Sequence, residues 1–529
     1  MKVKLSAFLL VPCIMLSSIP VFANQLSEIK ENTTPPHSQS AKSIDLEPIK
    51  EDSLHIDRLL SLGKNNFDSK NLNTQALMVR DPGTMVMENI TINSKEDLIK
   101  LLNNKITVGA SVGDMYRYGV KNANITLNAD CEISSDDINA DITENTTYPK
   151  YKFAFYMENC NFYGNSHTIK ITKGTREMYP LFGDLKVRDY FQSHIKDLNL
   201  VYEGDLCGTG FAQNIRTEYN MESYIIENIN IKVNGNLLPD MYERDMSWNP
   251  NVKYHIFTGQ AAGFAFRMAS AKLNNINIHV SGDIGLLDPQ VKNYNDGKYN
   301  KVEIGAFGFI SDNGKDTFGN TKNSKENHFR DVTNLNIKVD GSILAGSIHS
   351  IAQAAGLGYN VQAKKFKDVK LEVKGDIKAI NKGSTGIELG TEHTPISATG
   401  IAHNLHYLEN VEVKIGGSIE SENNVQLSVP TYACGIGAWD YENRLDKKQG
   451  LLESFPLTIK NVNLSVGGDI KVTSKTNKYK VKKPIIACAG FSNNMSSGLD
   501  NYDVFKNNTI DVKGDIVADS LKDNSIASL

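Results

Sequence analysis

One short part of the chain gathers residue types that could hold a metal ion or move protons. The segments "GIELGTEHTP" (386–395) and "GIAHNLHY" (400–407) contain Glu388, Glu392, His393, His403 and His406. Carboxylates and imidazoles of this kind are zinc ligands. In an extended chain, however, His403 and His406 point to opposite faces, because side chains alternate along a strand. A metal site here would require a turn, so we predict no metal centre.

Cleavage of a glycosidic bond needs two carboxylates about 5–10 Å apart. Most acids in this chain alternate with lysines, as Glu372 does between Lys370 and Lys374, which is typical of a solvated strand face. No HExxH motif is present. A further set of aspartates follows a recurring glycine, which predicts turn stabilisation with at most weak Ca²⁺ binding: Asp205, Asp283, Asp376, Asp469 and Asp515. We therefore expect no catalytic residue and no cofactor.

Aromatic residues in long insertions are the better candidates for a functional role. Exposed aromatic rings can stack on sugars or anchor a protein partner. The insertions contain Tyr242, Trp248, Tyr254, Trp439 and Tyr441. Trp248 and Trp439 follow different motifs, so they are expected to leave the fold at different corners. The alternative interpretation is that these rings fill gaps in the core.

The elements that must position these residues are repeats. A glycine recurs at intervals of 31 to 59 residues, and an Asn or Asp stands seven residues before each copy. The glycines, which we predict at turns, are Gly204, Gly235, Gly282, Gly341, Gly375, Gly417, Gly468 and Gly514. The Asn/Asp residues, which we predict to stack as a polar ladder at a corner, are Asp197, Asn228, Asn275, Asn334, Asp368, Asn410, Asn461 and Asn507.

Apolar residues alternate within each repeat, for example Val369, Leu371 and Val373 before Gly375. This period of two indicates a strand with one buried face. A second motif, small-x-Gly-apolar, lies between the copies, as in "AAGF" (261–264) and "ATGI" (398–401). Constant strands with variable connections predict stacked coils. The expected fold is an all-β, single-chain, right-handed β-helix of about eight or more coils, with long corner loops and a short capping helix at residues 95–104.

The segments "NANITLNADCEI", "CNFYGNSHTIKI", "YPLFGDL" and "IKDLNLVYEGDL" follow one another over residues 122–206. This succession resembles the GLUG-type repeats of bacterial cell-surface and secreted proteins. The resemblance implies a β-solenoid on an exported, adhesin-like protein. It implies little about activity, and Asn165 and His167 match a turn of the family pattern.

The start of the chain predicts export. Lys2 and Lys4 precede an apolar stretch and the small-residue site Val21-Phe22-Ala23, as in a cleaved secretory signal. We predict a signal peptide (1–23), a disordered leader (24–84), a capping and GLUG-like module (85–206) and solenoid repeats (207–529). Cys131 and Cys160 could form a disulfide, whereas Cys434 and Cys488 are expected to pack in the interior.

The remaining expectations concern partners. The net charge is −4 and no basic block occurs, so nucleic acid is not expected as a partner. No segment after the signal is apolar enough to span a membrane. Solenoid ends expose strand edges, which predicts self-association there. The sequence thus predicts a non-catalytic protein at the cell surface, outside the cell or in the periplasm, which binds a glycan or a host or envelope protein. The alternatives are a polysaccharide lyase or glycoside hydrolase of β-helix type and a structural envelope spacer.

Overall fold

The computed structural model describes Lys2–Val3 and most of residues 86–529. The residues not described are 1, 4–85, 109–114, 139–154, 189–190, 218–223, 245–253, 269–270, 292–297, 312–330, 362, 364, 383–395, 406, 425–430, 438–457, 476–485, 491–503, 521–524 and 529. Almost all of the predicted signal and the whole predicted leader therefore lie outside the described residues, as do Trp248, Trp439 and Tyr441.

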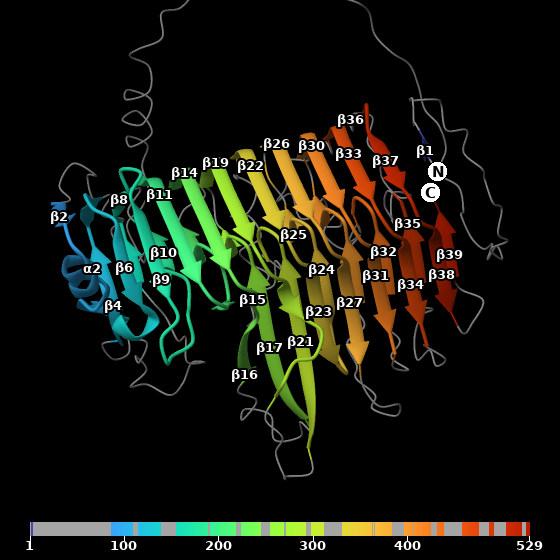
Figure 1. Ribbon diagram of the computed structural model, residues 1–529, viewed down its shortest axis with the longest axis horizontal. Helices are drawn as coiled ribbons and strands as arrows, with labels where there is room; N and C mark the ends of the chain where they lie inside the picture. The colour runs from blue at the N-terminus through green and yellow to red at the C-terminus, as the bar shows by residue number, and fades with distance from the viewer. Residues whose placement is uncertain are drawn as a thin grey trace, which may run out of the picture. The chain divides into compact units, whose positions relative to one another are not determined.

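The described part of the chain is all-β apart from short helical turns, and most strands pair in parallel with the next coil (Figure 1). This confirms the prediction of an all-β fold built from long parallel sheets. We number three sheets here. Sheet 1 has 15 strands: β1 (Lys2–Val3), β2 (Glu88–Ile92), β5 (Ala123–Leu127), β6 (Cys131–Ser134), β8 (Asn161–Tyr163), β9 (Thr168–Thr172), β11 (Ser193–Glu203), β14 (Tyr224–Asn234), β19 (Ala271–Val280), β22 (Asp331–Val339), β26 (Lys365–Val373), β30 (Tyr407–Ile415), β33 (Thr458–Val466), β36 (Val504–Lys506) and β37 (Thr509–Val512).

The coils that begin with β11 and β14 continue from sheet 1 into sheet 2 and then into sheet 3, whereas the later coils contribute two strands each to sheet 2. Sheet 2 has 16 strands: β12 (Leu206–Cys207), β15 (Leu237–Leu238), β16 (Asp240–Arg244), β17 (Tyr254–Ala262), β20 (Ile284–Leu286), β21 (Tyr299–Phe307), β23 (Ile343–Ile348), β24 (Ala352–Ala355), β27 (Ile377–Lys382), β28 (Ile396–Thr399), β31 (Ile419–Asn423), β32 (Thr431–Cys434), β34 (Ile470–Ser474), β35 (Ile486–Ala489), β38 (Ile516–Ser520) and β39 (Ser525–Ser528). Sheet 3 has six strands: β3 (Lys105–Val108), β4 (Met115–Lys121), β7 (Phe155–Glu158), β10 (Phe182–Val187), β13 (Ala212–Thr217) and β18 (Ala265–Met268). A separate pair consists of β25 (Gly358–Val361) and β29 (Ala402–Leu405). Isolated bridges through Ile310 align β25 with β18 of sheet 3.

The repeat fixes the register of the strands. In sheet 1 the first apolar position of each copy pairs with the same position of the next, as Ile276 does with Leu335 and Leu335 with Val369. These three side chains are at most 1% exposed. Stacking therefore buries identical columns on one continuous face, which a single coil could not do alone.

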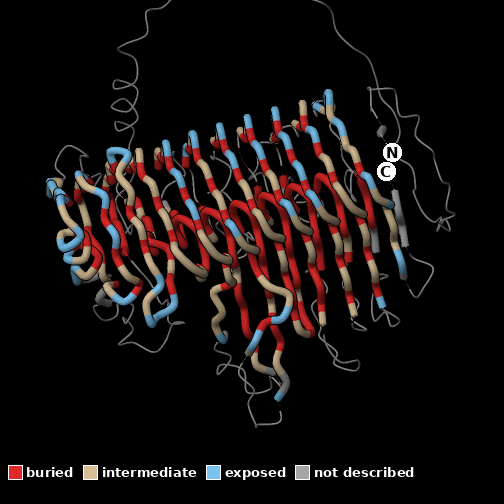
Figure 2. Tube along the Cα trace, viewed as in Figure 1, coloured by how far each residue is buried: buried red, intermediate tan, exposed pale blue. Residues whose placement is uncertain are grey.

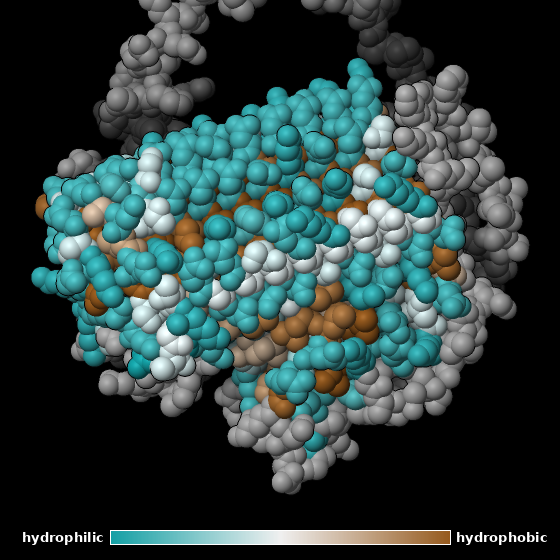
Figure 3. Space-filling model, viewed as in Figure 1, coloured by the Kyte–Doolittle hydropathy of each residue, from teal (hydrophilic) through white to brown (hydrophobic). Residues whose placement is uncertain are grey.

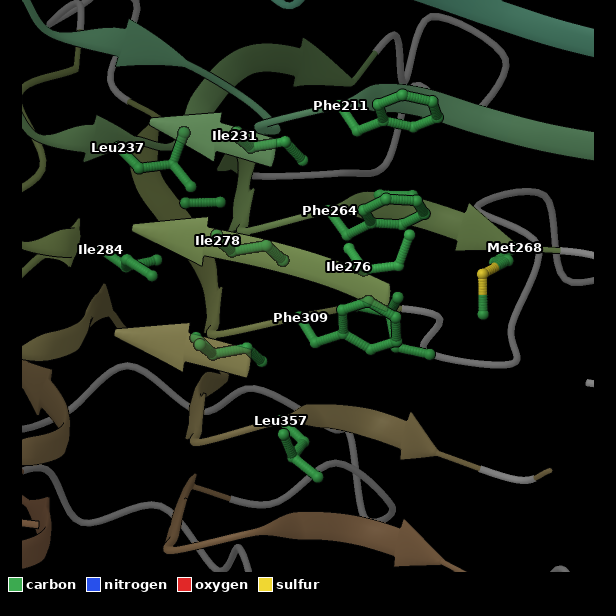
Figure 4. Close-up of a cluster of buried hydrophobic side chains, with 14 of the residues drawn as sticks. Phe211, Ile231, Leu237, Phe264, Met268, Ile276, Ile278, Ile284, Phe309 and Leu357 are labelled. Carbon is green, nitrogen blue, oxygen red and sulfur yellow. The ribbon is translucent and has the colours of Figure 1, made fainter. Parts of the chain in front are cut away.

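The core is a column of large side chains that follows the small-x-Gly motif from coil to coil. Phe211 and Phe264 stack with ring centroids 4.6 Å apart, and Phe264 lies 5.3 Å from Phe309. Figure 4 shows these rings stacked beside Ile231 and Ile278, with Leu357 next in the column. Long buried stretches run along the strands in Figure 2. The small column beside them is fully buried, as expected for a tight interior: Ala261, Ala306, Ala354, Ala398, Ala433 and Cys488.

The predicted helix is present as α2 (Lys95–Leu102), and a 3-10 turn, η2, spans Ser135–Asp137. The Ser94 hydroxyl accepts the backbone N–H of Asp97, and the Asp97 carboxylate accepts the N–H of Asn93. Leu98 and Leu102 are buried in the first coils of the core. Within the described residues, no helix has both the length and the apolar character that crossing a membrane requires.

The cysteines correct one expectation. Cys131 and Cys160 are both buried and both free, so the disulfide considered between them is not formed. Burial raises the pKa of the Cys160 thiol to about 12. Cys434 and Cys488 are fully buried, as expected for packing positions. All four therefore occupy packing positions.

Candidate functional site

The Asn/Asp column forms a hydrogen-bonded ladder inside the long strands of sheet 1. Asn228 donates its Nδ2 to Asp197 at 2.6 Å, Asn275 donates to Asn228 at 2.9 Å, and Asn461 donates to Asn410 at 2.8 Å. Every member has a φ between 53° and 56°, in the left-handed region that Asn and Asp tolerate best. The left-handed residue therefore bends each long strand of sheet 1 near its middle, and buried side chains lie both before and after the bend.

The glycine column forms a backbone ladder at the end of each sheet 1 strand. The N–H of Gly282 donates to the carbonyl of Gly235 at 2.9 Å, and Gly375 donates to Gly341 at the same distance. A Cβ on Gly235 would lie 2.5 Å from the backbone of Gly204. Since real Cβ atoms essentially never approach so closely, only glycine fits this column.

The aspartates after these glycines have a structural use. The Asp376 carboxylate accepts the backbone N–H of Ser418 at 2.7 Å, and the Ser418 hydroxyl accepts the N–H of Asp469 at 3.0 Å. Each side chain thus satisfies the backbone of the next coil. Among the described residues, no group of three or more His, Cys, Asp or Glu side chains could hold a metal ion.

Of the histidine-rich segment, the structure describes only His403, since Glu388, Glu392, His393 and His406 lie outside the described residues. His403 is 3% exposed, and its Nε2 lies 3.5 Å from the Ser397 hydroxyl. Its ring centroid lies 5.2 Å from that of Tyr359. Burial lowers the pKa of His403 to about 3, so the imidazole is neutral near pH 7.

Two of the insertions form a projecting arm. Strands β17 and β21 have nine residues each, whereas the equivalent strands β24, β28 and β32 have four. They pair in parallel from Tyr254↔Tyr299 to Ala262↔Phe307, and β16 pairs antiparallel with β17. Figure 1 shows β16, β17 and β21 extending beyond the neighbouring coils. We call β16, β17 and β21 the arm.

The arm brings two of the predicted aromatic positions into one hairpin. Tyr242 stands opposite Thr258, and Tyr254 lies four residues before Thr258. Tyr242 is partly exposed. On the same face of the arm, Lys301 and Glu303 form an ion pair of 3.1 Å, and Ser350 donates its hydroxyl to Glu303 at 3.2 Å. Figure 3 shows that the sheet 1 surface is hydrophilic in this view, whereas hydrophobic side chains gather where Figure 1 draws β23 and β27.

The outward face of the arm continues into a bend where sheet 2 meets sheet 3. Side chains from the two flanks meet across this bend: Ser311 donates to Gln260 at 2.9 Å, and His403 approaches Ser397. Phe307 lies between the flanks and is 1% exposed. The partly exposed Phe266 and Tyr359 pack against the cluster that Phe307 forms with Ala262 and Ala355. We call this site the re-entrant corner; its residues are Gln260, Phe266, Phe307, Ser311, Gln353, Tyr359, Ser397 and His403.

Sequence reasoning did not single out this corner, although a signal for it exists. Three residues after the motif glycines of four consecutive coils (Gly263, Gly308, Gly356 and Gly400) stand Phe266, Ser311, Tyr359 and His403. The residues just before them pair from coil to coil: Ala265 forms a parallel β-bridge with Ile310, and Ile310 forms one with Gly358. The constant offset therefore places the four side chains in one column.

A second group that the sequence analysis missed lies on the outward face of sheet 3. Glu158 of β7 is 8% exposed. It accepts the hydroxyl of Tyr156 and lies 3.3 Å from Arg188. On the neighbouring strand β10, Asp184 accepts Asn214 Nδ2 at 2.6 Å. Two carboxylates thus lie on adjacent coils of one sheet.

Neither carboxylate stands in the alternating Lys/Glu pattern that marks the solvated face. Arg216 lies 3.7 Å from Asp184, and Lys121 lies 3.7 Å from Glu158, so both acids have cationic neighbours. Such pairs are typical of structural ion pairs as well as of active sites. Spacing along the chain gave no signal, because the two strands are joined by a connection of irregular length.

Comparisons with family models, with curated proteins and with solved structures found no match for this chain, so the GLUG-type resemblance stays a prediction.

Proposed function

We propose that this protein is a non-catalytic, exported β-solenoid that binds a glycan or protein ligand, in the manner of an adhesin. In this proposal the coils form a right-handed β-helix of eight or more turns, and the protein is exported through a cleaved N-terminal signal to the cell surface or the medium. The periplasm is the alternative location. The stacked coils act as a rigid support, and the parts that interrupt the repeat carry the binding.

The observation that carries the proposal is the arm. Strands β17 and β21 continue five residues beyond the length of their equivalents and pair in register there. Ordering extra chain costs conformational entropy, and these residues are not needed to close a coil. Irregular segments on a rigid scaffold are where proteins concentrate binding residues. On the outward face of the arm Tyr242 is partly exposed, so its ring can contact a ligand. Lys301 is buried and paired with Glu303, which fixes the base of the arm.

The experiment is a glycan array and a cell-envelope extract array, both probed with the protein beginning at Asn24. The matched variant shortens the arm by joining Asp240 to Gln260 through an Asn-Gly turn, since these two residues are opposite each other in the hairpin. Binding by the unaltered protein that is lost in the shortened variant supports the proposal. Equal binding by the unaltered protein and the shortened variant would show that the arm is not the binding element. No binding on either array would count against a binding function.

The polysaccharide-degrading alternative is favoured by one observation, the Glu158 and Asp184 carboxylates on adjacent coils. If they act as acid and base, the unaltered protein releases reducing ends from polygalacturonate or a neutral β-glucan. The Glu158→Gln and Asp184→Asn variants would then each lose the activity, as expected for a carboxylate pair. Activity of that kind would replace the non-catalytic proposal.

A further inference from the structure

Four polar atoms in or beside the re-entrant corner are left unpartnered by the described residues, one on His403 of the corner and three on threonines next to it. The hydroxyls of Thr209, Thr258 and Thr399 and the Nδ1 of His403 are buried without a hydrogen-bond partner in the described part of the chain. Thr209 and Thr399 occupy the column of Phe307, and Thr258 lies on the outward face of the arm. A buried polar group without a partner is costly. Four such atoms on one face point to a ligand rich in hydroxyl groups.

Aromatic rings lie beside these atoms. Phe266 and Tyr359 are partly exposed and pack on the cluster of Ala262, Phe307 and Ala355. They stand two coils apart in one column, which corresponds to about 9.6 Å at the strand spacing of a sheet. Sugar rings present an apolar face of C–H groups that stacks on aromatic side chains. Two rings at this separation suit alternate units of an extended glycan chain.

The corner also lacks charge among the side chains that form it. Its polar members are amides, hydroxyls and the neutral imidazole of His403, which are Gln260, Ser311, Gln353 and Ser397 besides His403. On the same face, Lys301 and Glu303 neutralise each other's charge, with the Lys301 Nζ 3.1 Å from the Glu303 Oε1. The carboxylate at the edge of the corner is that of Asp240, opposite Gln260 on β16. It disfavours an acidic polymer, whereas a neutral polyol needs no opposite charge.

We propose that the re-entrant corner binds a neutral glycan chain that runs from coil to coil, with Phe266 and Tyr359 as stacking surfaces and Gln353 and His403 as hydrogen-bonding groups. This rests on the proposed binding function and names its ligand class. Tyr359 contacts the sugar, and His403 positions Tyr359 through the ring contact while offering Nδ1 to a hydroxyl.

The test is isothermal titration calorimetry of the full protein with cellohexaose, maltohexaose and laminarihexaose. At least one hexasaccharide is expected to bind. Tyr359→Ala should weaken that binding about tenfold, since stacking contributes on the order of a tenfold factor, while Tyr359→Phe should leave it within about twofold because the ring is kept. Tyr163→Ala, at a partly exposed tyrosine in sheet 1, is the matched control.

His403→Leu supplies a second readout. This variant keeps the packing volume but removes the hydrogen-bonding nitrogen, so its affinity for the hexasaccharide should fall. The affinity of Tyr359→Phe should stay near that of the unaltered protein. Thermal unfolding of each variant shows whether the fold is retained. The inference is overturned if no hexasaccharide binds, or if Tyr359→Ala and Tyr163→Ala bind equally well. Binding of only proteins or charged glycans on the arrays would keep the proposed function and reject the corner.

Discussion

Asn228 and Asn275 lie one above the other on adjacent coils, both with a φ of 56°, and Asn275 donates its side-chain amide to Asn228 at 2.9 Å. The same residue type thus serves two needs at once. The backbone must enter the left-handed region to bend the strand, and the side chain must bond to its neighbour. Few residue types other than Asn and Asp do both, which is why the column keeps its identity although the coils differ in length.

Replacing Asn275 separates these two needs. Asn275→Gly loses the amide but keeps the backbone conformation, whereas Asn275→Ala also forces an alanine into the left-handed region, which costs about 1–2 kcal/mol. We expect urea unfolding to rank the proteins as unaltered, Asn275→Gly and then Asn275→Ala. Equal unfolding midpoints for the two variants would show that the φ constraint is not important.

The glycines of the small-x-Gly motif stack by direct backbone approach. A Cβ on Gly308 would lie 2.0 Å from the carbonyl oxygen of Gly356, whereas a Cβ on Gly437 would meet its nearest atom at 3.0 Å. Gly308→Ala must therefore push two coils apart, with an expected loss of about 1–3 kcal/mol, as for overpacked sites. Gly437→Ala, the matched control, should lose less. Comparable thermal unfolding of both variants would contradict the steric explanation.

How far the sequence could predict this structure depends on which parts repeat. The apolar alternation around Gly375 and the position of Asn275 predict strand faces and register, because every coil must match its neighbour. The bend was predicted at a corner rather than within the strand, since a single residue type does not reveal φ. Yet the buried Ile195 and Leu198, three residues apart in one strand, break the alternation and indicate a bend.

The arm and the re-entrant corner were harder to foresee. The insertions before Tyr254 and Tyr299 differ in length, so nothing in the chain predicts that these two residues pair. The corner depends on a constant offset from a glycine, and the side chains there vary from phenylalanine to serine and histidine. The constant offset marks the position of this column, but the varying residue types within it do not indicate a role, so the proposed site was not predicted from the repeats.

The aromatic column gives a packing prediction. Phe264 is fully buried between Phe211 and Phe309, and the same column contains Leu357 and Ile401 in later coils. Phe264→Leu should therefore be tolerated with a loss of about 1–1.5 kcal/mol, since the column accepts aliphatic side chains. Phe264→Ala should lose about 3–5 kcal/mol, because it leaves a cavity between rigid coils. Chemical denaturation measures both losses of unfolding free energy. Similar losses for Phe264→Leu and Phe264→Ala would contradict the idea that Phe264 fills a rigid column that accepts aliphatic side chains.

His403 predicts how stability depends on pH. Its pKa is lowered to about 3 by burial, whereas an unfolded histidine has a pKa of about 6.5. As pH falls from about 6.5 towards 3, the unfolded chain binds a proton that the folded protein does not, so the free energy of unfolding decreases by about 1.4 kcal/mol per pH unit. Above about pH 6.5 both states are neutral and this contribution is constant.

His403→Leu should remove that slope, so the stability difference between variant and unaltered protein should shift in favour of the variant as pH falls from about 6.5 to 4. His167→Gln is the control, because His167 is much more exposed and pairs with Asp130 at the surface. Urea unfolding at half-unit pH steps measures the difference. If the stability of His403→Leu and of the unaltered protein changes with pH in parallel, the imidazole reaches solvent. That result would also weaken the case for His403 as a buried hydrogen-bonding group of the re-entrant corner.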